Sequence, residues 1–385
     1  MKNFMFYNPT QIVFGKDTIK KLDKLVPQES RVLITYGGGS IKKNGVYDQV
    51  TEALGNRKVF EFGAIEPNPH YETCLKCVDF IKENNIDFVL AVGGGSVIDA
   101  TKFIVAASLY EGEDKWEILL TGGNKITKAI PFGSVLTLPA TASEMNNGAV
   151  ITKKETLEKL AFHSEHCFPK FSILDPQTTF TLPERQIANG IADTFVHVME
   201  QYLTYPVRNQ ISDRFAESII ITLIEEAPKV FKDPMDYEVR ANLMWAATMG
   251  LNGWIACGAV QDWATHMIGH ELTAFHDIDH GTTLSIVLPG VMRVMKDEKG
   301  EKIIQFGERV FGIKEGSKEE RIGKTIKATE EFFESICIPT RLSHVGLNET
   351  CIEPIVQRMK ERNWSLGENG TINYEKVRLI LSDRL

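Results

Sequence analysis

Residues 86–99 read Ile86-Asp-Phe-Val-Leu-Ala-Val-Gly93-Gly-Gly-Ser96-Val-Ile-Asp99, and they carry the strongest indication of the fold class. An apolar, β-rich run stops at three glycines, and helical spacing then continues to Leu109. The run at 31–36 stops in the same way at Gly37-Gly38-Gly39, and 131–138 is a third strand candidate. Helical patterns at 46–54 and 71–83 separate these strands. Strands that alternate with helices indicate a parallel sheet with helices on both faces.

The second half of the chain has a different pattern, because long helical spacings replace the β-rich runs from Pro183 onward. These helical patterns cover 186–204, 212–231, 237–257, 261–274, 318–335 and 350–362. We therefore predict an α/β domain at 1–182 and an all-helical domain at 183–385. A chain of 385 residues is long enough for two domains of about 100–200 residues each.

The composition is typical of a globular protein with an acidic surface. The net charge of -8 argues against nucleic acid or an anionic membrane as the main partner, since both favour basic surfaces. Six cysteines are too few for a secreted disulfide scaffold, and no apolar run approaches the length of a membrane helix. The apolar run at the start is too short for a signal peptide and ends at Pro9. We expect a cytoplasmic protein.

The glycines at 93–95 are suited to holding a phosphate. Glycines before a helix let the backbone approach a pyrophosphate, and the helix start offers free N–H groups. Asp99 could accept hydrogen bonds from this loop or from a ribose. A plain glycine turn is the alternative interpretation, and Ile98 breaks the usual Gly-x-Gly-x-x-Gly pattern. Lys102 lies too far into the helix for a kinase-type phosphate loop, which disfavours phosphoryl transfer.

The earlier cluster, Gly37-Gly38-Gly39-Ser40, bears on the choice of dinucleotide. An acidic residue in this region would bind the adenine ribose and repel a 2′-phosphate, and none is present. Lys42 and Lys43 follow and add positive charge. This favours NADP(H) over NAD(H), although a flexible loop with two solvated lysines is also compatible with the pattern.

Spacing also predicts a metal site. Asp193 and His197 lie four residues apart on a predicted helix, and four of the nine histidines fall between His266 and His280. A solvated polar stripe is the alternative for the first pair. Spacing does not choose among His266, His270, His276 and His280. His163 and His166 form a rival pair, whereas Cys74 and Cys77 are interpreted as packing residues.

Several motifs together resemble the iron-containing, or group III, alcohol dehydrogenases over nearly the whole chain. The motifs are Pro67-Asn-Pro69, Gly93–Asp99, Leu138-Pro-Ala-Thr-Ala-Ser-Glu144, Asp193-x-x-x-His197 and His266 through His280-Gly281. Gly37–Ser40, Asp262–His266 and Gly269–Thr273 resemble the branch of NADPH-dependent aldehyde reductases and clostridial butanol dehydrogenases. The resemblance implies a dehydroquinate synthase-like architecture of an α/β nucleotide-binding domain and a helical domain, with a cleft between them.

The resemblance also implies a set of site residues. The metal ligands would be Asp193, His197, His266 and His280, binding one divalent ion, Fe(II) or Zn(II). His270 would lie near the reacting carbon, and we interpret it as a proton relay. The matching cofactor positions are Gly38, Ser40, Asn68, Gly94, Gly95, Ser96, Asp99, Thr137, Thr141, Asn146 and Lys159. Many members carry glycine at the position of Ala142, and because alanine is small we expect little effect.

The expected reaction is hydride transfer between NADP(H) and a small primary alcohol or aldehyde such as butanol or butyraldehyde. The metal would act as a Lewis acid toward the substrate oxygen, so no protein nucleophile is needed. Members of the family are often dimers, and we expect a homodimer. The alternatives are an NAD-dependent glycerol dehydrogenase, a dehydroquinate synthase or a non-catalytic nucleotide or metal sensor. A synthase would need a basic substrate pocket, whereas Trp254, Trp263 and Phe275 indicate an apolar one.

Overall fold

The computed structural model describes all 385 residues, which form two compact units. The sheet unit comprises Tyr7–Leu182 and Met235–Thr248. The helical unit comprises Met1–Phe6, Pro183–Pro234 and Met249–Leu385. Compared with the two predicted ranges, the first six residues belong to the helical unit and one helix after position 234 belongs to the sheet unit.

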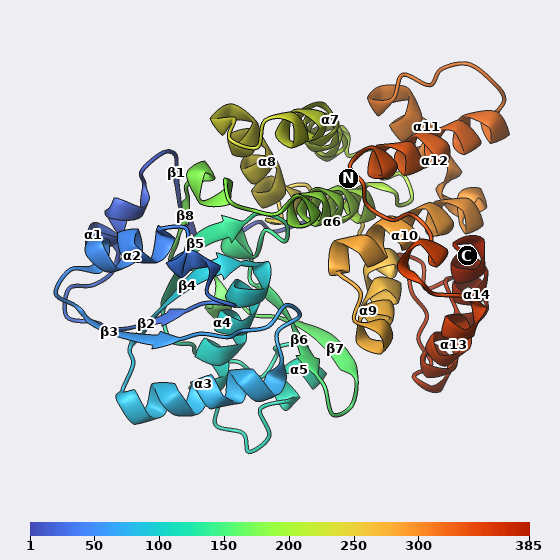
Figure 1. Cartoon of the computed structure of the whole chain (residues 1–385). Coiled ribbons are helices and arrows are strands. Elements are labelled where there is room, and N and C mark those ends of the chain that lie inside the picture. Colours follow the sequence, from blue (N-terminus) through green and yellow to red (C-terminus); the bar gives the residue numbers. More distant parts are fainter. The chain divides into compact units, whose positions relative to one another are not determined.

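The centre of the sheet unit is a six-stranded sheet in the order β1-β8-β5-β4-β2-β3 (Figure 1). The strands are β1 (Gln11–Phe14), β2 (Arg31–Thr35), β3 (Lys58–Phe62), β4 (Phe88–Gly94), β5 (Phe132–Leu138) and β8 (Phe171–Leu174). Every neighbouring pair is parallel. The prediction of an α/β fold with a parallel sheet is confirmed.

The side chains of β4 alternate between two cores, as expected for a sheet that is buried on both faces. Phe88, Leu90 and Val92 pack with the helices on one face, and Val89 and Ala91 pack with those on the other. The first face carries α1 (Leu22–Leu25) and α2 (Val46–Leu54), and the second carries α3 (Tyr71–Asn84), α4 (Gly95–Ala107) and α5 (Glu117–Leu120).

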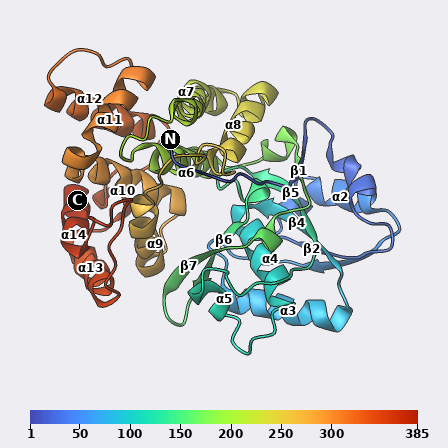
Figure 2. The same ribbon diagram turned by 180° about the vertical axis from the view of Figure 1, so that it is seen from behind.

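Two further elements complete the sheet unit. An antiparallel hairpin, β6 (Gly148–Lys153) and β7 (Glu158–His163), contacts α4 (Figure 2). Helix α8 (Tyr237–Gly250) packs here through Met244 and through Trp245, whose ring lies 6.0 Å from that of Phe14. This helix ends seven residues before the predicted limit of 257, because turns follow Gly250.

The helical unit consists of helices around buried apolar clusters, which confirms the second half of the predicted fold class. Its helices are α6 (Glu184–Tyr202), α7 (Gln210–Lys232), α9 (Ala264–His276), α10 (His280–Val294), α11 (Lys296–Val310), α12 (Lys318–Ser335), α13 (Ile352–Glu361) and α14 (Tyr374–Asp383). Helix α10 packs against both α6 and α9. None of the helices combines the length and the apolar character that a membrane span requires.

Candidate metal centre and nucleotide-binding loops

The helix that carries Asp193 and His197 is buried along nearly its whole length. Asp193, His197, Gln201 and the following Thr204 are each 4–5% exposed. The predicted polar stripe therefore faces the interior of the helical unit and not solvent. Burial of a carboxylate and an imidazole is unfavourable unless they are paired or bind an ion, so this stripe requires a chemical partner.

Asp193, His266 and His280 come together from α6, α9 and α10. One ligand atom from each lies within 4.8 Å of the other two. The Nε2 atoms of His266 and His280 are 3.8 and 3.7 Å from Oδ1 of Asp193. Ligands at about 2.1 Å around a tetrahedral ion are separated by about 3.4 Å, so these three side chains fit a divalent metal. Nε2 of His266 is buried and has no hydrogen-bond partner, as a metal ligand would be.

The other predicted histidines surround this group at different distances. Nδ1 of His197 is 3.3 Å from Oδ1 of Asp193, and its ring stacks on His266 at 4.5 Å, although His197 is outside the tight group. The His270 ring lies 5.3 Å from that of His280. His276 ends α9 and packs on Phe275. The assignment of all four ligands, and of His270 as the relay, stays a prediction.

A glycine sets the position of His280. At Gly281, an added Cβ would lie 2.4 Å from the backbone oxygen of Asn189 and 2.8 Å from its Cα. Helix α10 therefore begins in direct contact with the backbone of α6. Only glycine permits this approach, which brings His280 beside Asp193.

Glu200 is a further residue of the centre that the sequence analysis missed. Its carboxylate accepts a short hydrogen bond from Nδ1 of His266. Burial disfavours the charged imidazole, but Glu200 and Asp193 outweigh burial and raise the pKa of His266 to about 9. The available signal was its position: Glu200 is seven residues after Asp193 on the same helix face.

The loop after β2 differs from its prediction in charge. Gly38 is exposed with nothing within 4 Å of an added Cβ, and Gly39 is left-handed with φ 87°. Lys42, however, forms an ion pair of 2.6 Å with Glu61 of β3. Its charge is thereby compensated, which corrects the expectation that both lysines make this neighbourhood cationic. The exposed Lys43 remains as the cation of this loop.

The glycines at the start of α4 permit close packing. An added Cβ at Gly95 would lie 2.5 Å from Oγ1 of Thr141, and one at Gly94 would lie 2.9 Å from Cβ of Leu138. The N-terminus of α4, with Ser96 partly exposed, therefore lies directly against the segment that follows β5. Thr137 is a buried residue of that strand.

Residue 142 corrects one expectation. Ala142 has φ 52°, in the left-handed region that favours glycine. The constraint at this position is therefore the backbone conformation and not the space available for a side chain. The alanine introduces strain on the order of 1 kcal/mol that a glycine would avoid.

Asp99 and Lys102 of α4 form hydrogen bonds with the segment that follows β5. Asp99 accepts hydrogen bonds from Oγ of Ser143 (2.6 Å) and from the backbone N–H of Val150 (2.9 Å). Lys102 was not predicted as a site residue. Its ammonium group donates to Oδ1 of Asn146 and to the backbone oxygen of Gly148, both at 2.7 Å. Burial lowers the pKa of Lys102 to about 8, although the Asp99 charge opposes this shift.

Asn68 and Lys159 meet beside the β6–β7 hairpin. Nζ of Lys159 donates to Oδ1 of Asn68 at 2.9 Å, although 91 residues separate them. Asn68 has φ 52°, which is tolerated better by asparagine than by most residues. The predicted cofactor positions thus lie in the loops after β2, β3 and β5, at the ends of β4 and β5, in the first turns of α4 and on β7. Their contact with a cofactor stays a prediction.

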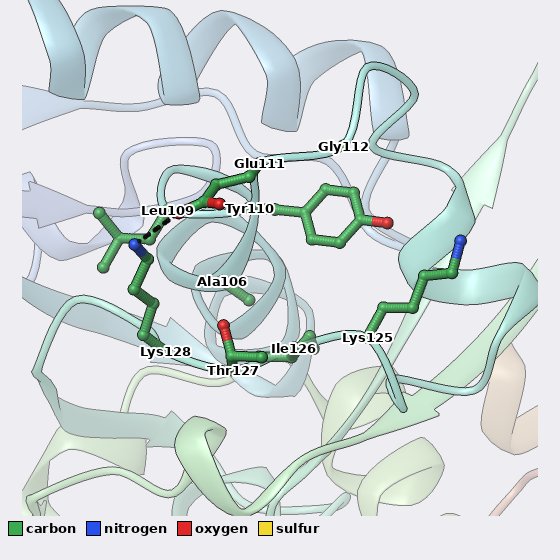
Figure 3. Close-up of a pocket in the computed structure, with 9 residues that line it drawn as sticks. All are labelled: Ala106, Leu109, Tyr110, Glu111, Gly112, Lys125, Ile126, Thr127 and Lys128. Atoms are coloured by element: carbon green, nitrogen blue, oxygen red, sulfur yellow. Dashed lines mark hydrogen bonds and ion pairs between the residues drawn. The ribbon is translucent and has the colours of Figure 1, made fainter.

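A cavity of about 160 Å³ lies near the C-terminal end of α4, the opposite end from Gly95 (Figure 3). Tyr110 and four residues at 125–128 contribute to its lining. Lys125 and Lys128 are paired with Glu117 and Glu111 at 3.0 and 2.9 Å. No unpaired charge is therefore available there to bind a ligand.

A parallel-sheet unit and a group of Asp and His side chains among helices are typical of one class of protein, the oxidoreductases that use a dinucleotide and a divalent metal. The family described as iron-containing alcohol dehydrogenase matches residues 9–176, and its C-terminal family matches residues 187–385. The chain belongs to the iron-containing alcohol dehydrogenase family, which confirms the resemblance.

Two relatives and two crystal structures document this similarity. The NADPH-dependent aldehyde reductase YqhD of Escherichia coli is 54% identical, with 99% of both chains covered. Its crystal structure has a TM-score of 0.98 and covers 100% of this chain and 99% of that one. A probable NADH-dependent butanol dehydrogenase 1 of Bacillus subtilis is 43% identical over 100% of both chains. The NADH-dependent butanol dehydrogenase A of Thermotoga maritima is 40% identical with a TM-score of 0.95, covering 100% of this chain and 99% of that one.

Proposed function

We propose that this protein transfers hydride between NADP(H) and a small primary alcohol or aldehyde, with butanol and butyraldehyde as representative substrates. The observation that carries the proposal is the buried group of Asp193, His266 and His280, which fits a divalent metal. The relative named an NADPH-dependent aldehyde reductase supports the choice of cofactor and substrate. Relatives named NADH-dependent butanol dehydrogenases make the cofactor the point to test first.

A bound divalent ion, Fe(II) or Zn(II), would supply Lewis acidity to the substrate oxygen. Asp193, His197, His266 and His280 would hold it. In the oxidative direction, a bound nicotinamide would supply the acceptor for the hydride of the alcohol carbon, and the imidazole of His270 would take up the hydroxyl proton.

The loops of the sheet unit would bind the dinucleotide. The backbone N–H groups at Gly95 and Ser96, at the start of α4, suit the pyrophosphate. Gly38, Ser40 and Lys43 suit the 2′-phosphate, because no carboxylate in this loop repels it. Asp99 and Lys102 keep the segment containing Asn146 in place through the hydrogen bonds described above.

The test is an assay of metal-stripped protein reloaded separately with Zn(II) and Fe(II). NADPH and NADH oxidation are followed with butyraldehyde as substrate. Rapid oxidation of NADPH and slow oxidation of NADH is the expected result. Faster oxidation of NADH would leave the hydride transfer intact and overturn the cofactor assignment. No oxidation of either cofactor with either metal would overturn aldehyde reduction and favour a synthase-like enzyme or a sensor.

We also propose a cytoplasmic homodimer, with neither nucleic acid nor membrane as a partner. The support for a dimer is an apolar patch on the helical unit. This N-terminal patch consists of Met1, Phe4, Met5, Phe6, Ile211, Phe215 and Trp254, all at least 38% exposed. The rings of Phe6 and Phe215 lie 5.3 and 5.8 Å from that of Trp254. This packing corrects the expectation that Trp254 contributes to an apolar substrate pocket, since its ring belongs to this exposed patch. Clustered exposed aromatic side chains are typical of protein interfaces.

A further inference from the structure

Glu200 is a residue of α6 whose side chain contacts the start of α9, and it is 3% exposed. Its carboxylate accepts three hydrogen bonds from the start of α9. The donors are the backbone N–H of Thr265 (2.5 Å), the backbone N–H of His266 (3.2 Å) and Nδ1 of His266. The two backbone partners are N–H donors, so the oxygens of Glu200 accept there.

The bond to Nδ1 determines which nitrogen of His266 is available to a ligand. Without an ion, Glu200 and Asp193 favour the doubly protonated ring. A metal at Nε2 would displace the proton of that nitrogen, and the carboxylate at Nδ1 would keep the other proton in place. Nε2 then presents its lone pair. This is the nitrogen that lies 3.8 Å from Oδ1 of Asp193 and lacks a hydrogen-bond partner.

The two backbone bonds determine where the helix begins. Thr265 and His266 are the second and third residues of α9, whose first N–H groups have no partner within the helix. Asp262 accepts from the N–H of Ala264 at 2.7 Å, so two carboxylates together satisfy the first turn. Glu200 belongs to α6, which also carries Asp193. One side chain therefore couples the position of α9 to the helix that bears another ligand.

We infer that Glu200 is the positioning residue of the metal centre: it orients the His266 ring, holds its proton on Nδ1 and ties the start of α9 to α6. The inference deepens the proposed function, since it rests on the metal centre proposed there. Carboxylates that hold a ligand histidine in this way raise metal affinity by about 10- to 100-fold in other proteins.

The test replaces Glu200 by glutamine and measures Zn(II) affinity by competition with a chelator. A glutamine NH2 group that donates to Nδ1 would leave the ring proton on Nε2. That proton occupies the lone pair with which Nε2 would bind the metal. We expect Glu200→Gln to bind Zn(II) about 10- to 100-fold more weakly than the wild type. The visible absorption of the Co(II)-loaded variant should also change, because the ligand field is altered. Wild-type affinity and an unchanged Co(II) spectrum would overturn the inference.

Glu217→Gln is the matched control. Glu217 is another buried carboxylate of the helical unit, and it accepts from the Tyr202 hydroxyl and from Arg309 without touching a histidine. This variant should bind Zn(II) as the wild type does. Equal loss of affinity in both variants would reduce Glu200 to a general structural role and overturn the inference.

Glu200→Asp provides a second test that retains the charge. The shorter carboxylate still accepts a proton donor, so it should bind Zn(II) several-fold more tightly than the glutamine variant and more weakly than the wild type. If the glutamine variant does not fold, wild-type affinity in the aspartate variant would overturn the inference.

Metal affinity is measured without turnover, so the two proposals fail separately. A wild type that binds Zn(II) but oxidises no cofactor would overturn the proposed function alone. A wild type that binds neither Zn(II) nor Co(II) would overturn the metal centre and the role of Glu200 with it.

Discussion

Gly38 is the residue at which the preference for NADP(H) can be tested by a single charge. It is exposed, its φ is not left-handed, and no atom lies within 4 Å of an added Cβ. Gly38→Asp therefore introduces a carboxylate without a steric clash. Repulsion of a 2′-phosphate through water at about 4 Å should raise the KM for NADPH about tenfold or more. Steady-state kinetics with both cofactors measure this change.

The uncharged Gly38→Asn variant is the control, because its side chain has nearly the same size. It should retain the preference for NADPH. An equal rise in KM for NADPH in both variants would show that the size of the side chain, and not its charge, causes the effect. An unchanged KM in the aspartate variant would show that the 2′-phosphate does not bind at this loop.

His270 is the residue at which proton transfer can be separated from metal binding. It is buried on α9, one turn after His266, and its ring lies 6.3 Å from that of His266. His270→Ala should lower kcat by about 100-fold or more, the usual contribution of a general acid or base. Metal content, measured by atomic absorption, should stay near that of the wild type.

His276→Ala on the same helix serves as the control, since His276 packs on Phe275 outside the metal group. It should leave kcat within a factor of a few. Loss of metal from the His270 variant would show that this histidine helps to bind the metal and would contradict its role as a proton relay.

At the scale of the elements, the contact between α10 and α6 decides whether the ligand set forms. Gly281→Ala would place a methyl group 2.4 Å from the backbone oxygen of Asn189, and backbone atoms cannot move aside as a flexible side chain can. We expect a loss of stability on the order of 1–3 kcal/mol, typical of an overpacked contact. Displacement of His280 should also weaken Zn(II) binding. Urea denaturation and chelator competition measure the two effects.

Gly323→Ala is the matched control on another helix. Gly323 lies in α12, and an added Cβ there meets nothing within 4 Å. The change should raise stability by up to about 1 kcal/mol, because alanine favours the helical conformation more than glycine does. A Gly281 variant that behaved in the same way would show that α10 can move without consequence for the site.

At the scale of the whole molecule, the N-terminal patch predicts the assembly state. Met5 is 85% exposed and lies at the centre of this short apolar segment. Met5→Glu places a charge where a second copy would bury the patch, so the dimer should dissociate at concentrations at which the wild type remains paired. Sedimentation equilibrium measures the change.

Leu379→Glu is the control for that experiment, since Leu379 is 58% exposed on α14 and outside the patch. It should leave the assembly unchanged. A wild type that sediments as a monomer, or a Met5 variant that stays dimeric, would contradict the assignment of the patch.

Local patterns in the chain were enough to predict the elements that show a clear period or end at a glycine cluster. The glycine-terminated runs became β2 and β4, and the run at 131–138 became β5, within two residues of the predicted limits. Local patterns did not indicate β1, β3, β6, β7 or β8. β3 is as long as β2, but no cluster of glycines marks its end as Gly37-Gly38-Gly39 marks the end of β2. Family resemblance selected His266 and His280, which spacing alone could not distinguish from His270 and His276.

The pairing of charges and the meeting of candidate ligands depend on tertiary packing and could not be predicted from local patterns. The charge of Lys42, in the loop after β2, is compensated by Glu61 of β3. The ring of His266 is oriented by Glu200 from another helix. A periodic pattern reports the environment of side chains within one strand or a few turns of helix. These contacts instead depend on the approach of segments far apart in the chain, such as α10 on α6 at Gly281. The local period therefore identified the elements, and close packing between them assembled the site.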